Sequence, residues 1–193
     1  AASDVYKRQV EEAMEQDQKI YLVTQRNVDS EDPTQEDLYQ MGIVADIKQV
    51  VRLQNDVVRI LVDGISRAAL LGFTGNEKYL EAEICYCDSN ADSLPEDLRE
   101  AMLLGVREAF HRYAAVVGKI SKELIRQIDQ YEDLEKLIDY VTNNLPVSYE
   151  LKQQVLEAED INDRYQVIVS LLLSQVEVIS CLLYTSPSPR DCS

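Results

Sequence analysis

The stretch from Met41 to Phe73 constrains the fold of this chain more than any other part of its sequence. Apolar and polar residues alternate along its first part. We expect the apolar ones to share one face of a strand, and they are Ile43, Ala45, Ile47, Val51 and Leu53. Period-two alternation is typical of a strand with one buried face. Asn55-Asp56 interrupts it with residue types that tolerate a tight hairpin turn. The inward face then resumes at Val58, Ile60 and Val62, and a further apolar run after Gly64 ends at Phe73. The stretch therefore predicts an antiparallel sheet built around a hairpin.

Shorter segments surround this hairpin. We expect a helix over Val10–Gln18, a strand over Ile20–Thr24 and a polar loop over Asn27–Asp37. A last strand is predicted over Lys78–Cys87, because four residues alternate there with Glu81, Glu83, Cys85 and Cys87: Leu80, Ala82, Ile84 and Tyr86. Short strands joined by turns favour an antiparallel barrel or a small sandwich.

From Pro95 onward the apolar period becomes helical. Ser93 and Glu96 form a possible capping box for a long helix that ends near Gly118. Its apolar face is expected to comprise Leu98, Met102, Ala109, Phe110, Tyr113 and Val117. Later helix boundaries are predicted by further signals, namely caps at Ser121, Ser148 and Asp160 and a break at Leu145-Pro146. The expected fold class is α+β, a small, incomplete, antiparallel barrel-like module over residues 10–92 followed by a helical bundle over residues 93–180.

The two ends of the chain, residues 1–9 and 181–193, look like translated DNA adapters. One DNA sequence that encodes Asp4–Gln9 is related to the other end of the chain. Its reverse complement encodes Cys181–Ser186 when it is read one base further along and extended by one base. Unrelated cellular termini would rarely share this relation. We therefore set both ends aside as artefacts and expect the remainder to be a fragment of a longer protein. The alternative is an ordinary Ser/Pro-rich tail.

Composition narrows the class of function. The chain has 193 residues, 46% of them apolar, which suffices for a sizeable core. Its formal charge of -16 disfavours nucleic acid as a partner. The longest strongly apolar run, Val167–Leu173, is shorter than the roughly 20 residues that cross a bilayer, so no membrane partner is expected. Few cysteines and no evident signal peptide favour the cytoplasm.

No set of residues assembles into an obvious active site or metal site. The six glycines never form a P-loop, and no serine sits in a recognisable nucleophile motif. Outside the two ends set aside, Cys85 and Cys87 have only His111 as a further nitrogen or sulfur ligand, so we expect structural or exposed roles for all three. An independent enzyme is therefore disfavoured, and catalytic, cofactor and metal residues are all predicted to be absent.

The residues do resemble a known family. The pattern around Gly42, Gly64 and Arg67 is similar to the amino-terminal domain of the bacterial ATP-dependent Lon protease. Leu145-Pro146 and the run from Asp160 through Asn162 to Arg164 fit the same domain, so that the resemblance spans nearly all of residues 10–180. We take Gly42, Gly64, Arg67, Pro146, Asp160 and Asn162 as structural signature residues of that family. The family also implies opening strands ahead of Val10, which is why the barrel is expected to be incomplete.

The resemblance implies a function in substrate recognition. It points to the region of a hexameric, cytoplasmic, ATP-dependent serine protease that engages misfolded, unfolded or tagged proteins. ATP and Mg would bind modules downstream of this fragment, which would hold no cofactor itself. The alternative is a stand-alone Lon-like polypeptide-binding module without ATPase or protease activity. The candidate polypeptide contacts are Val57 and Leu61, which are expected on the outward face of the hairpin, and Arg67. Packing against the helical bundle would also explain Val57 and Leu61. Pairing with a carboxylate would also explain Arg67.

Overall fold

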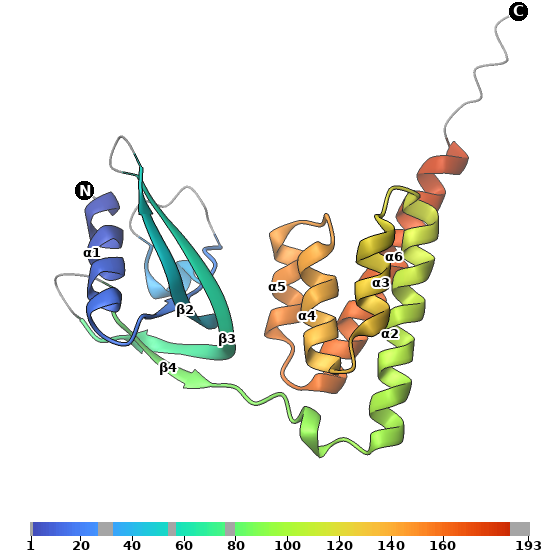
Figure 1. The fold of residues 1–193 in the computed structure, drawn as a ribbon, viewed down its shortest axis with the longest axis horizontal. Coiled ribbons are helices and arrows are strands. Elements are labelled where there is room, and N and C mark those ends of the chain that lie inside the picture. The colour runs from blue at the N-terminus through green and yellow to red at the C-terminus, as the bar shows by residue number, and fades with distance from the viewer. Residues whose placement is uncertain (1, 27–32, 54–56, 76–79, 186–193) are drawn as a thin grey trace, which may run out of the picture. The chain divides into compact units, whose positions relative to one another are not determined.

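The chain divides into two compact units, Ala1–Asp88 and Ser89–Ser193. A computed structural model describes residues 2–26, 33–53, 57–75 and 80–185. Figure 1 shows that the first unit carries the sheet and the second is helical. The predicted α+β class is therefore confirmed.

The first unit is an open sheet with a helix beside it. Its elements are α1 (Ala2–Glu15), β1 (Lys19–Leu22), the 3-10 turn η1 (Gln35–Asp37), β2 (Met41–Arg52), β3 (Val58–Phe73) and β4 (Ala82–Tyr86). The four strands are antiparallel and lie in the order β1-β2-β3-β4. A sheet that stays open agrees with the prediction of an incomplete barrel. The predicted turn at Asn55-Asp56 lies outside the described residues.

Helix α1 differs from the prediction, which placed it over Val10–Gln18. It starts at Ala2 and ends at Glu15. Gln18 has a φ of 61°, a left-handed conformation that a right-handed helix excludes, so the helix cannot reach it. Val10 is buried as expected.

The central hairpin is longer and more irregular than predicted. β3 runs without a break through Gly64 for 16 residues. The pairing of β2 with β3 shifts by one residue at Lys48, between Ile47 and Gln49. A one-residue insertion turns the side chains that follow it to the other face of the sheet. The prediction that Val51 and Leu53 face inward is therefore wrong, and they are 38% and 41% exposed.

The predicted inward face of β2 is correct only for residues that precede this bulge. Ala45 and Ile47 are buried as predicted, but Val44 is buried too and Ile43 only partly. β4 is shorter than the strand predicted over Lys78–Cys87, and of the alternating residues Ala82 and Ile84 are partly buried. Leu80 and Tyr86 are exposed, because they lie before and at the end of this short edge strand.

A tyrosine packed over a glycine ties the first three strands together. A Cβ added at Gly42 would lie 2.4 Å from the carbonyl oxygen of Leu22 and 2.7 Å from the ring of Tyr21. The Tyr21 hydroxyl donates a hydrogen bond of 3.0 Å to the Ala68 carbonyl on β3. Only glycine leaves room for this ring at position 42. Gly64 differs, since a Cβ there would meet Ile43 at an ordinary 3.5 Å.

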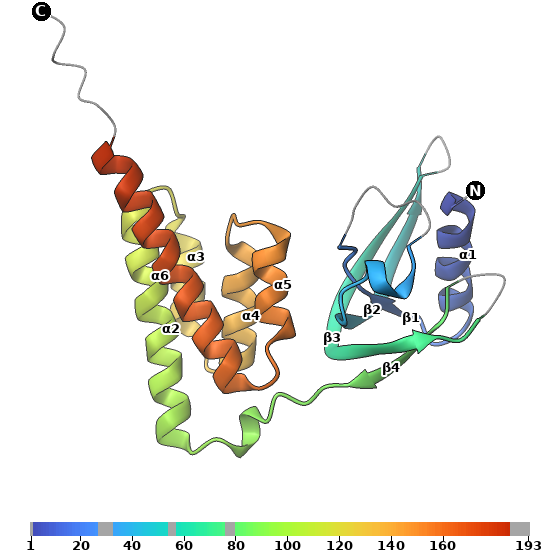
Figure 2. The same ribbon diagram turned by 180° about the vertical axis from the view of Figure 1, so that it is seen from behind.

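The second unit is a bundle of helices. After the 3-10 turn η3 (Ala91–Ser93) come α2 (Glu96–Val117), α3 (Lys122–Gln130), α4 (Leu134–Asn144), α5 (Tyr149–Glu157) and α6 (Ile161–Thr185). Figures 1 and 2 show α2 and α6 side by side along much of their length. One apolar core joins them to the shorter helices, and its fully buried members include Val106, Phe110, Ile128, Leu134, Leu137, Ile138, Val141, Ile168 and Leu172. Leu98, predicted to belong to the apolar face, lies in the first turn of α2 and is 44% exposed.

Most predicted helix ends are confirmed. Gly118 ends α2 with a φ of 66°, and the Ser121 hydroxyl accepts a hydrogen bond from the backbone N–H of Leu124 at 3.2 Å. Asp160 accepts two hydrogen bonds from the first turn of α6, at 2.8 and 2.9 Å. The capping box of Ser93 is wrong. Its hydroxyl donates to the Asn90 carbonyl at 2.7 Å within the preceding turn, and Pro95 occupies the cap position.

Helix α6 is longer than the sequence pattern indicated. Among the described residues it is the one helix, over Ile161–Leu182, that is long and apolar enough to cross a membrane by length and composition alone. Core helices of soluble proteins meet the same criteria, so this is weak support for a membrane span. α6 contributes Ile168 and Leu172 to the bundle core.

Candidate functional site

An exposed row of apolar side chains lies on one face of the β2–β3 hairpin. Its members, here called the hairpin stripe, are Val51, Leu53, Val57 and Leu61. The strand register places them on the same face, since Val51 pairs with Arg59, Gln49 pairs with Leu61, and the Leu53 N–H donates to the Val57 carbonyl at 2.8 Å. Val57 and Leu61 are 53% and 59% exposed. Apolar side chains gathered at this exposure are suited to contact with another molecule.

The opposite face of the hairpin is the one that faces α1. Arg52 lies between Val51 and Leu53 along β2 and so points to the other side of the sheet. Its guanidinium pairs with the Glu11 carboxylate of α1 at 2.6 Å. Figure 1 shows α1 standing beside this hairpin. The helix therefore contacts the side away from the stripe.

Arg67, the third polypeptide-binding candidate, lies in a different environment. It is 8% exposed, in the part of β3 that pairs with Ile43. Its carbonyl accepts a hydrogen bond of 3.0 Å from the Cys87 N–H. Because its side chain is buried, Arg67 does not belong to the exposed hairpin stripe.

The residues that sequence analysis weighed as metal ligands are dispersed. Cys85 and Cys87 are free thiols near β4, while His111 lies on α2 and pairs with Asp129 at 2.8 Å. Within the described ranges, no group of three or more His, Cys, Asp or Glu residues could hold a metal ion. The His111–Asp129 contact is half exposed, where a polar pair contributes little to stability.

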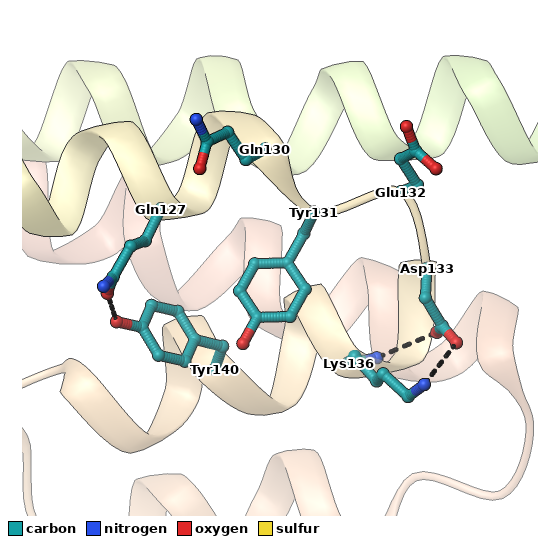
Figure 3. A pocket seen from close by; sticks show the side chains of 7 residues that line it. All are labelled: Gln127, Gln130, Tyr131, Glu132, Asp133, Lys136 and Tyr140. Carbon is teal, nitrogen blue, oxygen red and sulfur yellow. Dashed lines mark hydrogen bonds and ion pairs between the residues drawn. The ribbon is translucent and has the colours of Figure 1, made fainter.

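A second candidate surface was not found from the sequence. It is a shallow, open hollow of about 550 Å³ at the junction of α3 and α4, here called the tyrosine hollow (Figure 3). Its lining comprises Gln127, Gln130, Tyr131, Glu132, Asp133, Lys136 and Tyr140. The rings of Tyr131 and Tyr140 lie with centroids 5.0 Å apart and planes tilted by 35°. Tyr131 follows the end of α3 and Tyr140 lies within α4, so spacing along the chain gave no signal of their pairing.

The signature residues of the second unit support its helices. Asp160 caps α6, and Pro146 lies exposed between α4 and α5. Arg164, one turn into α6, is 1% exposed and pairs with Asp139 and, at 3.5 Å, with Glu135 on α4. This buried cation ties the two helices together. Sequence reasoning missed the pairing, because its partners lie 25 or more residues away.

Comparison with known proteins assigns the chain to a family. The family model for the substrate-binding domain of ATP-dependent protease La (LON) matches residues 3–174. This chain belongs to that family. The match starts within residues 1–9, whose origin as an adapter remains a prediction. The resemblance to the Lon amino-terminal domain drawn from Gly42, Gly64 and Arg67 is thus confirmed.

Curated proteins that are similar in sequence to this chain are named as Lon proteases. The chain is 33% identical to a Lon protease of Lachnoclostridium phytofermentans over 170 residues, and 33% identical to Lon protease 1 of Hydrogenovibrio crunogenus over 167 residues. These matches cover 88% and 86% of this chain but 21% and 20% of the relatives. The chain therefore spans about a fifth of the length of these curated relatives.

Solved structures support the fold. The N-terminal domain of a Lon protease from the Mycobacterium avium complex aligns with a TM-score of 0.61 at 16% identity, covering 80% of this chain and 90% of that one. A Lon N-terminal domain protein from Xanthomonas campestris aligns with a TM-score of 0.56 at 12% identity, covering 86% and 82%. The predicted order of a sheet module and then a helical bundle is the fold of Lon amino-terminal domains.

Proposed function

We propose that this chain engages polypeptide substrates through the hairpin stripe, as the recognition region of a Lon-type ATP-dependent serine protease that degrades misfolded and regulatory proteins. Membership of the Lon substrate-binding family supports substrate binding. The observation that carries the proposed surface is the exposure of Val57 and Leu61. An unfolded polypeptide exposes apolar side chains that a folded one buries, so this surface would distinguish the two states.

The binding would be weak and tolerant of sequence. Fully burying one aliphatic side chain contributes about 1.5–3 kcal/mol, and much of that is offset by the cost of ordering an unfolded segment. An isolated site of this kind releases its ligand readily. Such a site can hold many different polypeptides in turn, which suits a module that selects substrates for degradation.

The rest of the proposed system lies outside this chain. In it, ATP and Mg bind downstream modules, a homohexamer forms, and the protein works in the bacterial cytoplasm. Neither nucleic acid nor membrane is a partner, since a formal charge of -16 repels phosphates. The second candidate, a stand-alone polypeptide-binding module, lacks an observation in its favour. A reading frame that stops soon after Ser180 would support it, and one that continues into ATPase and peptidase motifs supports the first proposal.

Fluorescence anisotropy tests the stripe. A labelled, reduced and carboxymethylated lactalbumin serves as the unfolded ligand and native lactalbumin as the folded one. We expect binding of the unfolded form only, and about a threefold to tenfold weaker affinity for Leu61→Ser. Leu71→Ser is the matched control, because Leu71 lies on the same strand with 58% exposure. Equal losses in both variants, or equal binding of both ligands, would contradict the proposal.

A further inference from the structure

Two free thiols lie near each other at the end of β4, in a part of the sheet that the proposed function does not use. Cys85 is exposed and Cys87 is partly buried. The Cys87 N–H donates a hydrogen bond of 3.0 Å to the Arg67 carbonyl, so the extended pairing with β3 continues as far as this residue. Side chains two residues apart on an extended strand point to the same face. Cys85 and Cys87 are therefore neighbours on one face of the sheet.

Both sulfur atoms lie against the same short length of backbone. The Sγ of Cys87 donates to the Cys85 carbonyl oxygen at 3.6 Å, and the Sγ of Cys85 donates to the Tyr86 carbonyl oxygen at 3.7 Å. A thiol is a weak donor, so these hydrogen bonds cost little to break. The two thiols are thus kept beside the strand and remain available to a ligand that binds sulfur more strongly.

The spacing of the two residues favours a bridge that is longer than a disulfide. A strand rises about 3.3 Å per residue, which places the two Cβ atoms about 6.6 Å apart. A disulfide needs a Cβ–Cβ separation of about 3.5–4.5 Å, so it would distort the strand. A metal–thiolate bond in a zinc site is about 2.3 Å long, so an ion between two opposed sulfurs would hold them about 4.6 Å apart. A metal ion can therefore bridge these thiols without bending β4.

The number of available ligands limits which ion can bind. Zinc takes three or four protein ligands, and in the part of the chain that the structure describes no group of three or more His, Cys, Asp or Glu residues could hold a metal ion. The prediction that metal ligands are absent rests on this count. Copper(I) differs, because two opposed thiolates complete its coordination, and soft thiolate ligands select it over harder ions. The formal charge of -16 also attracts a cation.

We infer that Cys85 and Cys87 chelate one copper(I) ion between their sulfur atoms. Binding replaces the two thiol protons with the ion, so two copper–sulfur bonds form, two protons are released and no electron is transferred. The bound ion would link the last residues of β4 and would stabilise the β unit by mass action. The site uses no residue of the hairpin stripe, so its test is independent of the proposed polypeptide binding.

Titration with copper(I) tests the inference on the full chain. The sequence has four cysteines, and Cys181→Ser/Cys192→Ser removes the two that lie outside the β unit. This double variant is reduced, kept free of oxygen and titrated with tetrakis(acetonitrile)copper(I) against the chromophoric chelator bathocuproine disulfonate. We expect one ion to bind per chain. Adding Cys85→Ser or Cys87→Ser should weaken binding about a hundredfold or more, because the second thiolate no longer acts within the same chain.

Matched measurements locate the ion. Glu83→Gln is the control variant, because Glu83 lies two residues before Cys85 on the same face of β4 and carries a carboxylate in place of a thiol. It should leave the affinity for copper(I) unchanged. X-ray absorption should show two sulfur neighbours around the copper. Hydrogen exchange resolved by peptide should slow over β4 on addition of copper(I), and only in chains that hold both thiols.

Several outcomes would overturn the site. These are the absence of copper binding by the Cys181→Ser/Cys192→Ser chain, or equal binding after Cys85→Ser, whose exposed position keeps the fold intact. A dimer that forms only with copper(I) in size-exclusion chromatography would also overturn it, because the ion would then join two chains. Leu61→Ser should leave copper binding unchanged. Copper binding by a chain that fails to bind unfolded lactalbumin would contradict the proposed function and leave this site intact.

Discussion

The two units use the same packing contact but differ in how much apolar surface they bury. In each, a tyrosine lies against a glycine that has no room for a side chain: Tyr21 on Gly42 in the sheet, and Tyr165 on Gly105 between α6 and α2. The helical unit surrounds its contact with a continuous core. The β unit leaves more large apolar side chains exposed, among them the hairpin stripe.

The difference indicates where stability and binding reside. Burying apolar surface stabilises a fold, while apolar surface left exposed is available to a partner. We therefore expect the helical unit to be the more resistant to unfolding. The β unit would depend on fewer contacts, such as the one at Gly42, and would supply the larger apolar binding surface.

The largest expected effect comes from the helical core. Leu137 is fully buried, so Leu137→Ala should lower the free energy of unfolding by about 2–5 kcal/mol through lost burial and a cavity. Leu104→Ala is the control, because Leu104 is 55% exposed on α2 and its loss should cost under about 0.5 kcal/mol. Urea unfolding followed by circular dichroism measures both. Similar losses would show that the bundle core does not determine stability.

A smaller loss is expected at Gly42. Gly42→Ala places a Cβ against the backbone oxygen of Leu22, which must move, at a cost of about 1–3 kcal/mol. Gly64→Ala meets only an ordinary contact and should change stability by less than about 0.5 kcal/mol. Hydrogen exchange resolved by peptide should show the loss in the β unit. Equal effects at the two glycines would contradict the packing explanation.

The cap of α6 should contribute about 1 kcal/mol. Asp160→Ala removes two hydrogen bonds to the first turn, at 2.8 and 2.9 Å. Asn162→Ala, a neighbouring signature residue with an exposed side chain, serves as the control and should be nearly neutral. Thermal unfolding compares the two variants. A larger loss for Asn162→Ala would assign that side chain a role that its exposure does not explain.

The smallest effect is a dependence on alkaline pH in the β unit. Burial, with an electrostatic contribution from Cys87, raises the pKa of Tyr21 to about 12 from an ordinary value of 10.0. The folded state therefore holds this proton more tightly than the unfolded state. The stabilisation is complete below pH 10 and is lost as the pH rises from 10 toward 12.

Comparison with Tyr21→Phe isolates that loss. The difference in the free energy of unfolding between the wild type and the variant, measured by urea titration, should shrink as the pH rises above 10, by less than about 1 kcal/mol at pH 11 because the phenol is only partly buried. A difference that stays constant from pH 9 to pH 11 would show that the hydroxyl of Tyr21 titrates normally in the fold.

The sequence predicted what depends on neighbours along the chain. Gly118, Ser121 and Asp160 end or begin helices through contacts within one turn, and all three were identified correctly. The face on which Val51 lies was predicted wrongly, because it depends on a bulge at Lys48 that only the pairing with β3 creates. The capping role of Ser93 failed because the Asn90 carbonyl, also nearby, competes for its hydroxyl.

The candidate surfaces divide in the same way. Val57 and Leu61 could be assigned to the outward face of the hairpin by alternation alone, and both are exposed. The pairing of Tyr131 with Tyr140 could not be predicted from alternation, because the turn between α3 and α4 is what brings their rings together. Arg67 was a candidate by resemblance, but its burial in the sheet follows from tertiary packing.

The close contact between Tyr165 and Gly105 couples two positions on neighbouring helices. A Cβ at position 105 would lie 2.3 Å from the Tyr165 hydroxyl and 3.2 Å from its ring. A larger residue at 105 would therefore have to displace the end of the Tyr165 side chain or widen the spacing of α2 and α6, unless position 165 carried a smaller residue. Because the two residues are in contact, we expect the effects of substitutions at them to depend on each other rather than to add.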